Sequence, residues 1–434
     1  MTTDSLAQPL TLPCGAVLPN RLCKAAMTEG LADAHNRATE GHVRLYRRWG
    51  KGGAGLLLTG NVQVDRRYLE RPGNVVIEGA QSAAQREALQ RWAAAGKEGG
   101  AAIWMQINHA GRQTPALVTS EPVGPSAVPV ALPGGQFGAP RALSGAEIED
   151  IIARFAHTAR IARETGFDGV QIHSAHGYLL SEFLNPLANQ RTDEWGGPLE
   201  NRARLLRAIV AAVRNAVGKD FPVGVKLNSA DFQKGGFSFA ESRQVAAWLR
   251  GDGVDLLEIS GGNYEQPVMM GKEGLEPVFE EEKRASTRAR EAYFLDYARQ
   301  MLAADTPPLM VTGGFRTRAA MESALEDDGI AMIGLARPLC ANPDGPRQLL
   351  NGERDQLKRW EEVLRIGPGW LGPNSSNDTL RMINAWGAQG WFCLQILRMG
   401  AGKDPDLRLG VLRAFFAYRA SEKKKARALA RQDP

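Results

Sequence analysis

One segment of the chain, residues 166–186, carries three side chains whose types and spacing suit chemistry on a polar substrate. A predicted strand ends in His173, and His176 and Tyr178 follow directly after it. Two neighbouring imidazoles can donate hydrogen bonds to one carbonyl or phenolate oxygen, and a nearby tyrosine can supply a proton. The same His-x-x-His spacing can hold a metal ion, although no HxE motif or acidic cluster nearby clearly supplies a third ligand. A purely structural pair of histidines is the third interpretation.

Two glycine-containing strand ends later in the chain suit the binding of a phosphate. Gly313-Gly314 follows one apolar run, and Gly334-Leu-Ala336-Arg337 ends another. Backbone N–H groups at such places can surround a phosphate, phosphate sites after strands seven and eight recur in barrels, and an arginine adds a charge-assisted contact. Ordinary turn glycines beside a surface arginine are the alternative. Together the two motifs indicate a cofactor that carries a phosphate.

A third glycine motif, Gly50-Lys-Gly52-Gly-Ala-Gly55, matches the GxGxxG pattern of dinucleotide-binding folds. That pattern works only after a strand and at the start of a helix, where the helix N-terminus meets the pyrophosphate. Here a predicted helix precedes the glycines and a predicted strand follows them. The motif therefore favours a tight helix-to-strand turn over a Rossmann site.

The elements that must position these residues alternate between short apolar runs and amphipathic segments. The apolar runs are residues 22–27, 55–59, 102–107, 169–173, 223–227, 256–259, 309–312 and 331–335. Strands without a polar side are typical of a parallel sheet that is buried on both faces. Helices are expected at 39–49, 83–95, 199–217, 287–303 and 317–325, and after capping boxes that begin at Ser144 and Ser238. Eight strand–helix units predict an α/β protein with a (β/α)8 TIM barrel.

The chain divides at about residue 350 on this interpretation. Residues 1–350 are expected to form the barrel, and residues 351–434 a C-terminal helical extension with a basic tail. Helices are predicted at 384–399 and 407–419, the second with an apolar stripe of Leu407, Val411, Phe415 and Tyr418. The extension is expected to pack on the barrel or on a second subunit, so a homo-oligomer is one option. Binding of its Lys-rich end to a membrane surface is the alternative.

The charge distribution argues against a nucleic-acid partner. The 434-residue chain has a net charge of +5, and residues 403–434, with nine Lys/Arg and four acidic residues, hold all of that excess. The remaining residues have 44 basic and 44 acidic side chains, so they create no overall field that attracts a polyanion.

Four widely spaced cysteines, without a CxxC pair, argue against a disulfide framework, a zinc ribbon or an iron–sulfur cluster. Reduced thiols fit a cytoplasmic location best. The N-terminal residues have no basic-then-apolar pattern, and no apolar stretch approaches about 20 residues. Neither secretion nor a membrane span is predicted.

The motifs, taken in order, resemble the Old Yellow Enzyme family of flavin-dependent ene-reductases, also called the NADH:flavin oxidoreductase family. The resemblance covers about residues 8–350 and depends on an ordered series of motifs. These are Asn20-Arg21 with Ala25-Ala26-Met27-Thr28, the segment 104–112 with Gln106 and His109, His173-Ser-Ala-His176-Gly-Tyr178, the segment 189–197, Lys226, Gly313-Gly314 and Ala336-Arg337.

The resemblance implies FMN at the barrel mouth. Its phosphate would lie at Gly313, Gly314, Ala336 and Arg337. Its ring would be lined by Ala25, Met27 and Thr28 after strand one and by Gly60 or Asn61 after strand two, and the Thr28 hydroxyl would contact a ring carbonyl. Gln106 would bind the pyrimidine edge, because an amide is both donor and acceptor. Lys226 would place positive charge near the reduced flavin.

Several positions depart from the pattern of the family. Many relatives have proline where this chain has Ala26, and arginine where it has Lys226. One subfamily has cysteine at the position of Thr28 and a substrate-contacting tyrosine at the position of Gly30. The substrate preference of that subfamily therefore does not carry over to this chain.

The resemblance implies an FMN-dependent oxidoreductase in which NAD(P)H reduces FMN and an electrophilic small-molecule alkene, such as an α,β-unsaturated carbonyl compound, is then reduced at its C=C bond. His173 and His176 would bind the substrate oxygen and Tyr178 would donate the proton. Because Cys393 stands alone after the barrel, an additional iron–sulfur relay is not expected. The alternatives are a metal-dependent barrel hydrolase that uses the two histidines, and a non-catalytic scaffold that acts through the basic tail.

Overall fold

Eight parallel strands close into a barrel in the computed structural model, which describes residues 4–132, 135–262 and 294–431. In barrel order these strands are β3 (Leu22–Lys24), β4 (Leu56–Leu58), β6 (Ala102–Asn108), β9 (Gly169–Ser174), β10 (Val223–Asn228), β11 (Leu256–Ser260), β12 (Leu309–Thr312) and β13 (Met332–Leu335). Each pairs with the next, and β13 pairs with β3. The short β5 (Val62–Gln63) pairs with β6. The predicted (β/α)8 barrel is confirmed.

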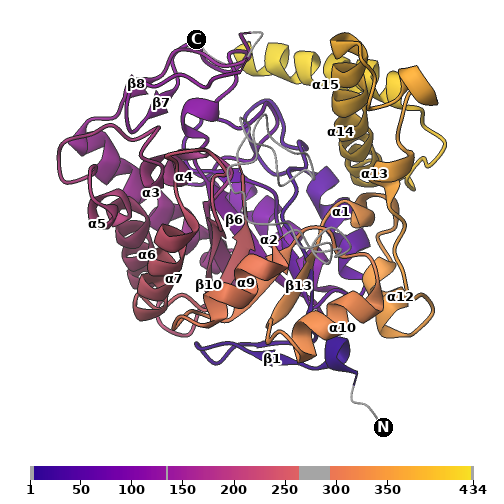
Figure 1. Ribbon diagram of the computed structural model, residues 1–434, viewed down its shortest axis with the longest axis horizontal. Coiled ribbons are helices and arrows are strands. Elements are labelled where there is room, and N and C mark those ends of the chain that lie inside the picture. The colour runs from indigo at the N-terminus through magenta and orange to yellow at the C-terminus, as the bar shows by residue number, and fades with distance from the viewer. Residues whose placement is uncertain (1–3, 133–134, 263–293, 432–434) are drawn as a thin grey trace.

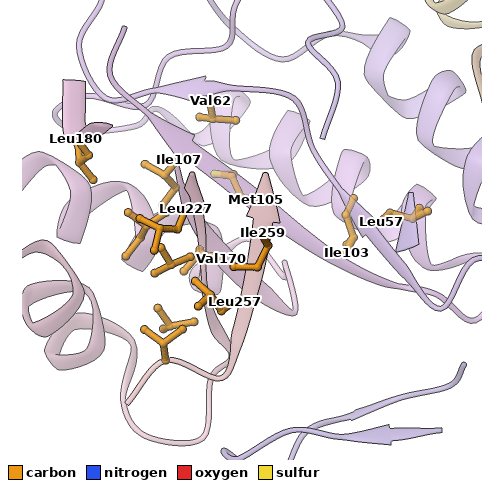
Figure 2. Packing of buried hydrophobic residues seen from close by; sticks show 14 of the residues in the cluster. Leu57, Val62, Ile103, Met105, Ile107, Val170, Leu180, Leu227, Leu257 and Ile259 are labelled. Carbon is orange, nitrogen blue, oxygen red and sulfur yellow. The ribbon is translucent and has the colours of Figure 1, made fainter. Parts of the chain in front are cut away.

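The strands alternate between a face that meets the surrounding helices and a face that fills the barrel. In β6, Ile103, Met105 and Ile107 belong to the large core cluster, with side chains of other barrel strands such as Val170 and Ile259 (Figure 2). Trp104, between them, belongs to a separate inner cluster. The strands are buried on both faces, as a parallel sheet requires.

Helices surround the barrel (Figure 1). They include α1 (Glu40–Gly50), α2 (Ala83–Lys97), α3 (Gly145–Glu164), α4 (Leu179–Leu184), α5 (Leu199–Arg202), α6 (Arg204–Val217), α7 (Phe239–Gly251), α9 (Leu295–Leu302), α10 (Arg318–Glu326), α11 (Pro338–Ala341) and α12 (Gly345–Leu350). The capping boxes at Ser144 and Ser238 begin α3 and α7 as predicted. The expected helix at 199–217 is divided into α5 and α6. The expected helix at 287–303 lies partly outside the described residues, and α9 is its described part.

The GxGxxG segment joins the end of α1 to β4, so the helix-to-strand turn is confirmed. A Cβ atom at Gly52 would stand 2.1 Å from the carbonyl oxygen of Pro343, and one at Gly55 would stand 2.6 Å from that of Asn20. Glycine is needed here because two backbone segments approach closely.

The end of the barrel at which the strands begin is covered by the β1 (Leu10–Thr11) and β2 (Val17–Leu18) hairpin. Leu10, Leu12 and Leu18 pack with the barrel side chains Cys23, Leu56, Leu58, Trp104, Leu256, Met310 and Met332. The hairpin and the C-terminal helix α15 (Val411–Ala430) lie at opposite ends of the molecule (Figure 1). The sequence motifs follow the strand ends, so they lie on the rim of the barrel opposite the hairpin.

After the barrel come α13 (Trp360–Val363), α14 (Asp378–Gly400) and α15. Both predicted C-terminal helices exist, and both are longer than expected. α14 packs against α15 and also against α1 and α11 of the barrel. The extension therefore packs on the barrel, which is one of the two arrangements predicted for it. The predicted apolar stripe is wrong at Leu407, because this residue precedes α15 and is 47% exposed. In the described part of the chain, no helix has the length and apolarity needed to cross a bilayer.

Candidate active site

His173 lies at the end of β9 and is buried. The backbone N–H of Ala175 donates to its Nδ1 across 3.2 Å. Because Nδ1 accepts this hydrogen bond, the proton of the neutral ring is on Nε2. The hydrogen bond thus leaves His173 with a donor, Nε2–H.

His176 is held in a backbone conformation that non-glycine residues rarely adopt, with φ at 64°. Its backbone N–H donates to Asn228 Oδ1 across 3.1 Å, and its Nε2 lies 2.7 Å from Ser260 Oγ. The two partners come from the ends of β10 and β11. Side chains of two neighbouring strands therefore fix both the backbone and the ring of His176.

Tyr178, at the start of α4, lies next to the His173 imidazole. Its ring centroid lies 5.0 Å from that of His173, and the His173 and His176 centroids lie 5.1 Å apart, both pairs edge to face. The structure thus brings together the three residues that the sequence singled out.

Burial lowers the pKa of both His173 and His176 well below the ordinary value, and the nearby Lys226 ammonium lowers it further. Both rings are therefore neutral near pH 7. A neutral imidazole still has one N–H group, so the pair can donate hydrogen bonds without carrying charge.

A hydrogen-bonded chain crosses the barrel interior beside the histidines. Gln106 Nε2 donates to Gln171 Oε1 across 2.7 Å, and Gln171 Nε2 donates to Glu258 Oε2 across 2.8 Å. Lys226 Nζ lies 2.9 Å from Glu258 Oε1. The sequence indicated Gln106 and Lys226 but missed Gln171 and Glu258, which stand between them.

The segment after β3 lies against the loop that follows β4. The Thr28 hydroxyl donates to Glu70 Oε2 across 2.8 Å, and Asn61 is close to the same oxygen. The backbone N–H of Gly60 donates to Glu29 Oε1 across 2.7 Å. A Cβ atom at position 60 would overlap the Glu29 carboxylate, so this position requires glycine.

Met27 and Ala25 complete this side of the rim. Met27 Sδ lies 3.5 Å from Cys340 Sγ on α11, and Ala25 is buried, with its N–H bonded to the carbonyl of Leu335 on β13. The residues expected to line the flavin ring therefore lie near β13, the last strand. The residues expected to bind the phosphate of the cofactor lie at the ends of the same strand and of its neighbour β12.

The two glycine-containing strand ends are neighbours, because Thr312 of β12 pairs with Gly334 of β13. Gly313 and Gly314 both have positive φ, at 122° and 91°. A Cβ atom at Gly334 would stand 1.9 Å from Thr312 Oγ1, a buried atom without a hydrogen-bond partner among the described residues. Close backbone, positive φ and a polar atom without a partner fit the approach of a phosphate-bearing group.

Ala336 and Arg337 follow β13 directly, and α11 begins at the next residue, Pro338. Both are partly exposed. The two residues thus follow the strand that pairs with β12, and Gly313 and Gly314 follow β12 itself. Barrels often bind phosphate at this position. Within residues 4–132, 135–262 and 294–431, no group of three or more His, Cys, Asp or Glu side chains is arranged to hold a metal ion.

A polar rim of this kind on a closed parallel barrel is typical of barrel enzymes that bind a phosphate-bearing cofactor. Comparison with known proteins identifies the family. The NADH:flavin oxidoreductase / NADH oxidase family matches residues 5–356. The NADH-dependent flavin oxidoreductase iliE of Hypocrea jecorina (strain QM6a) is 40% identical over 359 residues, which are 79% of this chain and 88% of that protein.

Two solved structures extend the comparison. The 2-naphthoyl-CoA reductase complex with 2-naphthoyl-CoA has a TM-score of 0.71 at 26% identity, over 80% of this chain and 52% of that one. The old yellow enzyme homologue from Zymomonas mobilis has a TM-score of 0.67 at 27% identity, over 81% and 94%.

The chain belongs to the NADH:flavin oxidoreductase / NADH oxidase family. It is a flavin oxidoreductase of the Old Yellow Enzyme type, with FMN and NAD(P)H as cofactors. The resemblance drawn from the ordered motifs is confirmed.

Proposed function

We propose that this oxidoreductase reduces the activated C=C bond of α,β-unsaturated carbonyl compounds in two alternating half-reactions. FMN would supply the hydride-transfer chemistry between NAD(P)H and the alkene. The observation that carries the proposal is the cluster of His173, His176 and Tyr178 at the barrel rim, in which His173 and Tyr178 are buried and both imidazoles are neutral.

The two histidines bind the carbonyl oxygen of the substrate. His173 donates through Nε2, since its Nδ1 already accepts from Ala175. His176 donates through Nδ1 when the Ser260 hydroxyl donates to its Nε2 across 2.7 Å. Two N–H donors on one oxygen draw electron density from the alkene and favour attack at the β-carbon.

Tyr178 supplies the proton to the α-carbon. It is buried and lies edge to face with His173, beside the proposed position of the substrate oxygen. A phenol there can act as a general acid because it loses its proton only while the new C–H bond forms.

The remaining rim residues would hold FMN. Its phosphate would bind at Gly313, Gly314, Ala336 and Arg337, and its ring would lie against Ala25, Met27, Thr28, Gly60 and Asn61. Gln106 would bind the pyrimidine edge, and Lys226 would act nearby as a positive charge. This assignment is supported by the neighbouring ends of β12 and β13 and by the buried amide of Gln106.

The test is an anaerobic visible spectrum of the desalted protein, recorded during addition of NADH or NADPH and then of cyclohexenone. Flavin bands that bleach with the nicotinamide and return with the enone are expected. Bleaching without recovery would support the flavin assignment but would show that the enone is not a substrate. A colourless protein that cannot be reconstituted with FMN would contradict the cofactor site.

The location and the assembly of the protein are also proposals. Four free cysteines, among them the buried Cys23 and Cys340, fit a reducing compartment such as the cytoplasm. Exposed apolar side chains on the C-terminal helices, including Trp386 and Phe416, fit contact with a second copy of the chain. Size-exclusion chromatography with light scattering tests the second proposal.

A further inference from the structure

The Glu70 carboxylate accepts a hydrogen bond from the Thr28 hydroxyl. Thr28 Oγ1 donates to Glu70 Oε2 across 2.8 Å, and the Asn74 amide donates to the same oxygen across 3.3 Å. A hydroxyl has one proton to donate. While this hydrogen bond is present, Thr28 cannot donate to a second acceptor.

The other oxygen of Glu70 is held by Arg71. Nε and Nη2 of Arg71 lie 3.0 and 2.9 Å from Glu70 Oε1. The Glu70 side chain is 3% exposed and that of Arg71 is 19% exposed, so the pair is largely shielded from water. The two charge-assisted hydrogen bonds to Oε1 hold this oxygen in place and balance the charge of the carboxylate, while Oε2 is left to accept from Thr28.

Arg71 is in turn held by the C-terminal extension. Its Nη1 donates to the Tyr418 hydroxyl oxygen on α15 across 2.6 Å and lies 3.7 Å from Cys393 Sγ on α14. A hydrogen-bonded chain thus runs from α15 through Arg71 and Glu70 to Thr28. Both helices lie beyond residue 356, where the match to the family ends.

A second contact brings α15 to the same segments. A Cβ atom at Gly30 would stand 3.1 Å from Lys425 Nζ, and one at Gly73 would stand 3.3 Å from Lys425 Cδ. Lys425 therefore occupies the space that side chains at these positions would need. Gly30 is two residues after Thr28 and Gly73 is two after Arg71, so α15 packs close to both the Thr28 and the Arg71 segments of the hydrogen-bonded chain.

We propose that Glu70 is a positioning residue of the FMN site, held by Arg71 and through it by Tyr418, and that it directs the Thr28 proton away from the flavin. This inference rests on the proposed placement of the FMN ring against Thr28. A hydroxyl that donates to a ring carbonyl stabilises the reduced, electron-rich flavin more than the oxidised one. Withholding that proton keeps the midpoint potential of bound FMN low, and the C-terminal extension thereby influences the cofactor.

A double-mutant cycle tests the role of Glu70. Glu70→Gln keeps the shape of the side chain but weakens it as an acceptor, so Thr28 is free to turn toward the flavin. The midpoint potential of bound FMN, measured by equilibration with redox dyes, should rise. A tenfold gain in relative affinity for reduced FMN corresponds to about 30 mV for a two-electron couple.

Loss of a nearby negative charge also raises a potential, and Thr28→Val separates the two causes. The proposal predicts that Glu70→Gln raises the potential clearly less in the Thr28→Val background than in the wild type, because the valine side chain has no hydroxyl proton to redirect. Equal rises in the two backgrounds would overturn it.

The link to α15 is tested by Tyr418→Phe, which removes only the hydroxyl that Arg71 contacts. The potential should rise, by less than in Glu70→Gln, and the dissociation constant of FMN, measured by flavin fluorescence, should change in the same variant. Phe416→Leu is the matched control, because Phe416 is on the same helix and 62% exposed. If Tyr418→Phe equals the wild type in both measurements, or Phe416→Leu changes them as much, the proposed link is wrong.

Different experimental results would contradict this inference and the proposed function. A wild-type protein that does not bind FMN would contradict the FMN site itself. A wild-type protein that binds FMN, with additive effects of the variants, would contradict only the positioning role of Glu70.

Discussion

Lys226 on β10 and Glu258 on β11 face each other inside the barrel, with 2.9 Å between Nζ and Oε1. Both side chains are buried, and Gln171 donates to the second oxygen of Glu258. The positive charge proposed to act near the flavin is therefore largely balanced in the protein itself. Its effect depends on Glu258 as much as on Lys226.

Glu258→Gln should make bound FMN easier to reduce. The substitution keeps the size of the side chain and removes the negative charge, so Lys226 is left uncompensated beside the cofactor. We expect the midpoint potential to rise by roughly 30 mV or more, equivalent to a tenfold gain in relative affinity for reduced FMN. Equilibration with redox dyes measures this shift. Lys226→Met should lower the potential, and a shift of the same sign in both variants would contradict this account.

Tyr178→Phe should separate the two half-reactions. Loss of the general acid is expected to slow reoxidation of the protein by cyclohexenone by about 100-fold or more, while the reduction of FMN by NAD(P)H stays nearly unchanged. Anaerobic stopped-flow absorbance follows each half-reaction separately. Equal losses in both would show that the substitution disturbs the site as a whole and that Tyr178 is not the specific proton donor.

Ser260→Ala should weaken enone binding through His176. Without the Ser260 hydroxyl at 2.7 Å, the His176 ring is no longer fixed in the form that presents Nδ1–H to the substrate. We expect KM for cyclohexenone to rise about tenfold, the equivalent of about 1.4 kcal/mol, with a smaller change in kcat. Ser174→Ala is the control, since the buried Ser174 Oγ has no hydrogen-bond partner among the described residues. A similar KM change in both variants would remove Ser260 from this role.

His42→Gln should make the protein less sensitive to acid. Burial lowers the pKa of His42 to about 4, and its Nδ1 accepts from the Thr39 N–H at the start of α1. The unfolded chain binds a proton below about pH 6.5 and the folded chain only below about pH 4, so the free energy of unfolding falls as the pH drops through this window.

Glutamine can accept the same hydrogen bond and does not titrate. Between about pH 7 and about pH 4.5, we expect the wild type to lose roughly 2 kcal/mol more stability than the variant. Urea unfolding at the two pH values measures the difference. Burial also lowers the pKa of His109 to about 4, but that residue contributes equally to both proteins. An identical loss in wild type and variant would refute the role of His42.

The eight strands and the crossover helices are predictable because their signals are local. A strand buried on both faces is an unbroken apolar run, and a capping box such as Ser144 with Glu147 marks a helix start within four residues. His173, His176 and Tyr178 can be found for the same reason, since they follow one strand end directly. The predicted length of α15 is too short because its second half lacks an apolar stripe, although Lys, Arg and Ala are good helix formers.

The polar partners inside the barrel have no such signal. Glu258 is a single acid within an apolar run, and only the pairing and register of β9, β10 and β11 bring it to Lys226 and Gln171. Likewise, nothing in the sequence connects Arg71 with Tyr418, which lies 347 positions away. Contacts of this kind depend on how the whole chain packs, and spacing along the sequence does not encode them.

The apolar hairpin under the barrel has a consequence for kinetics. Leu10, Leu12 and Leu18 pack against the end at which the strands begin. In the proposed reaction, NAD(P)H and the alkene would therefore both approach from the rim. Two reactants that share one entrance and one position over the cofactor compete for it. Each reactant at high concentration should therefore inhibit the half-reaction of the other, and the rate should be highest at a balanced ratio of the two.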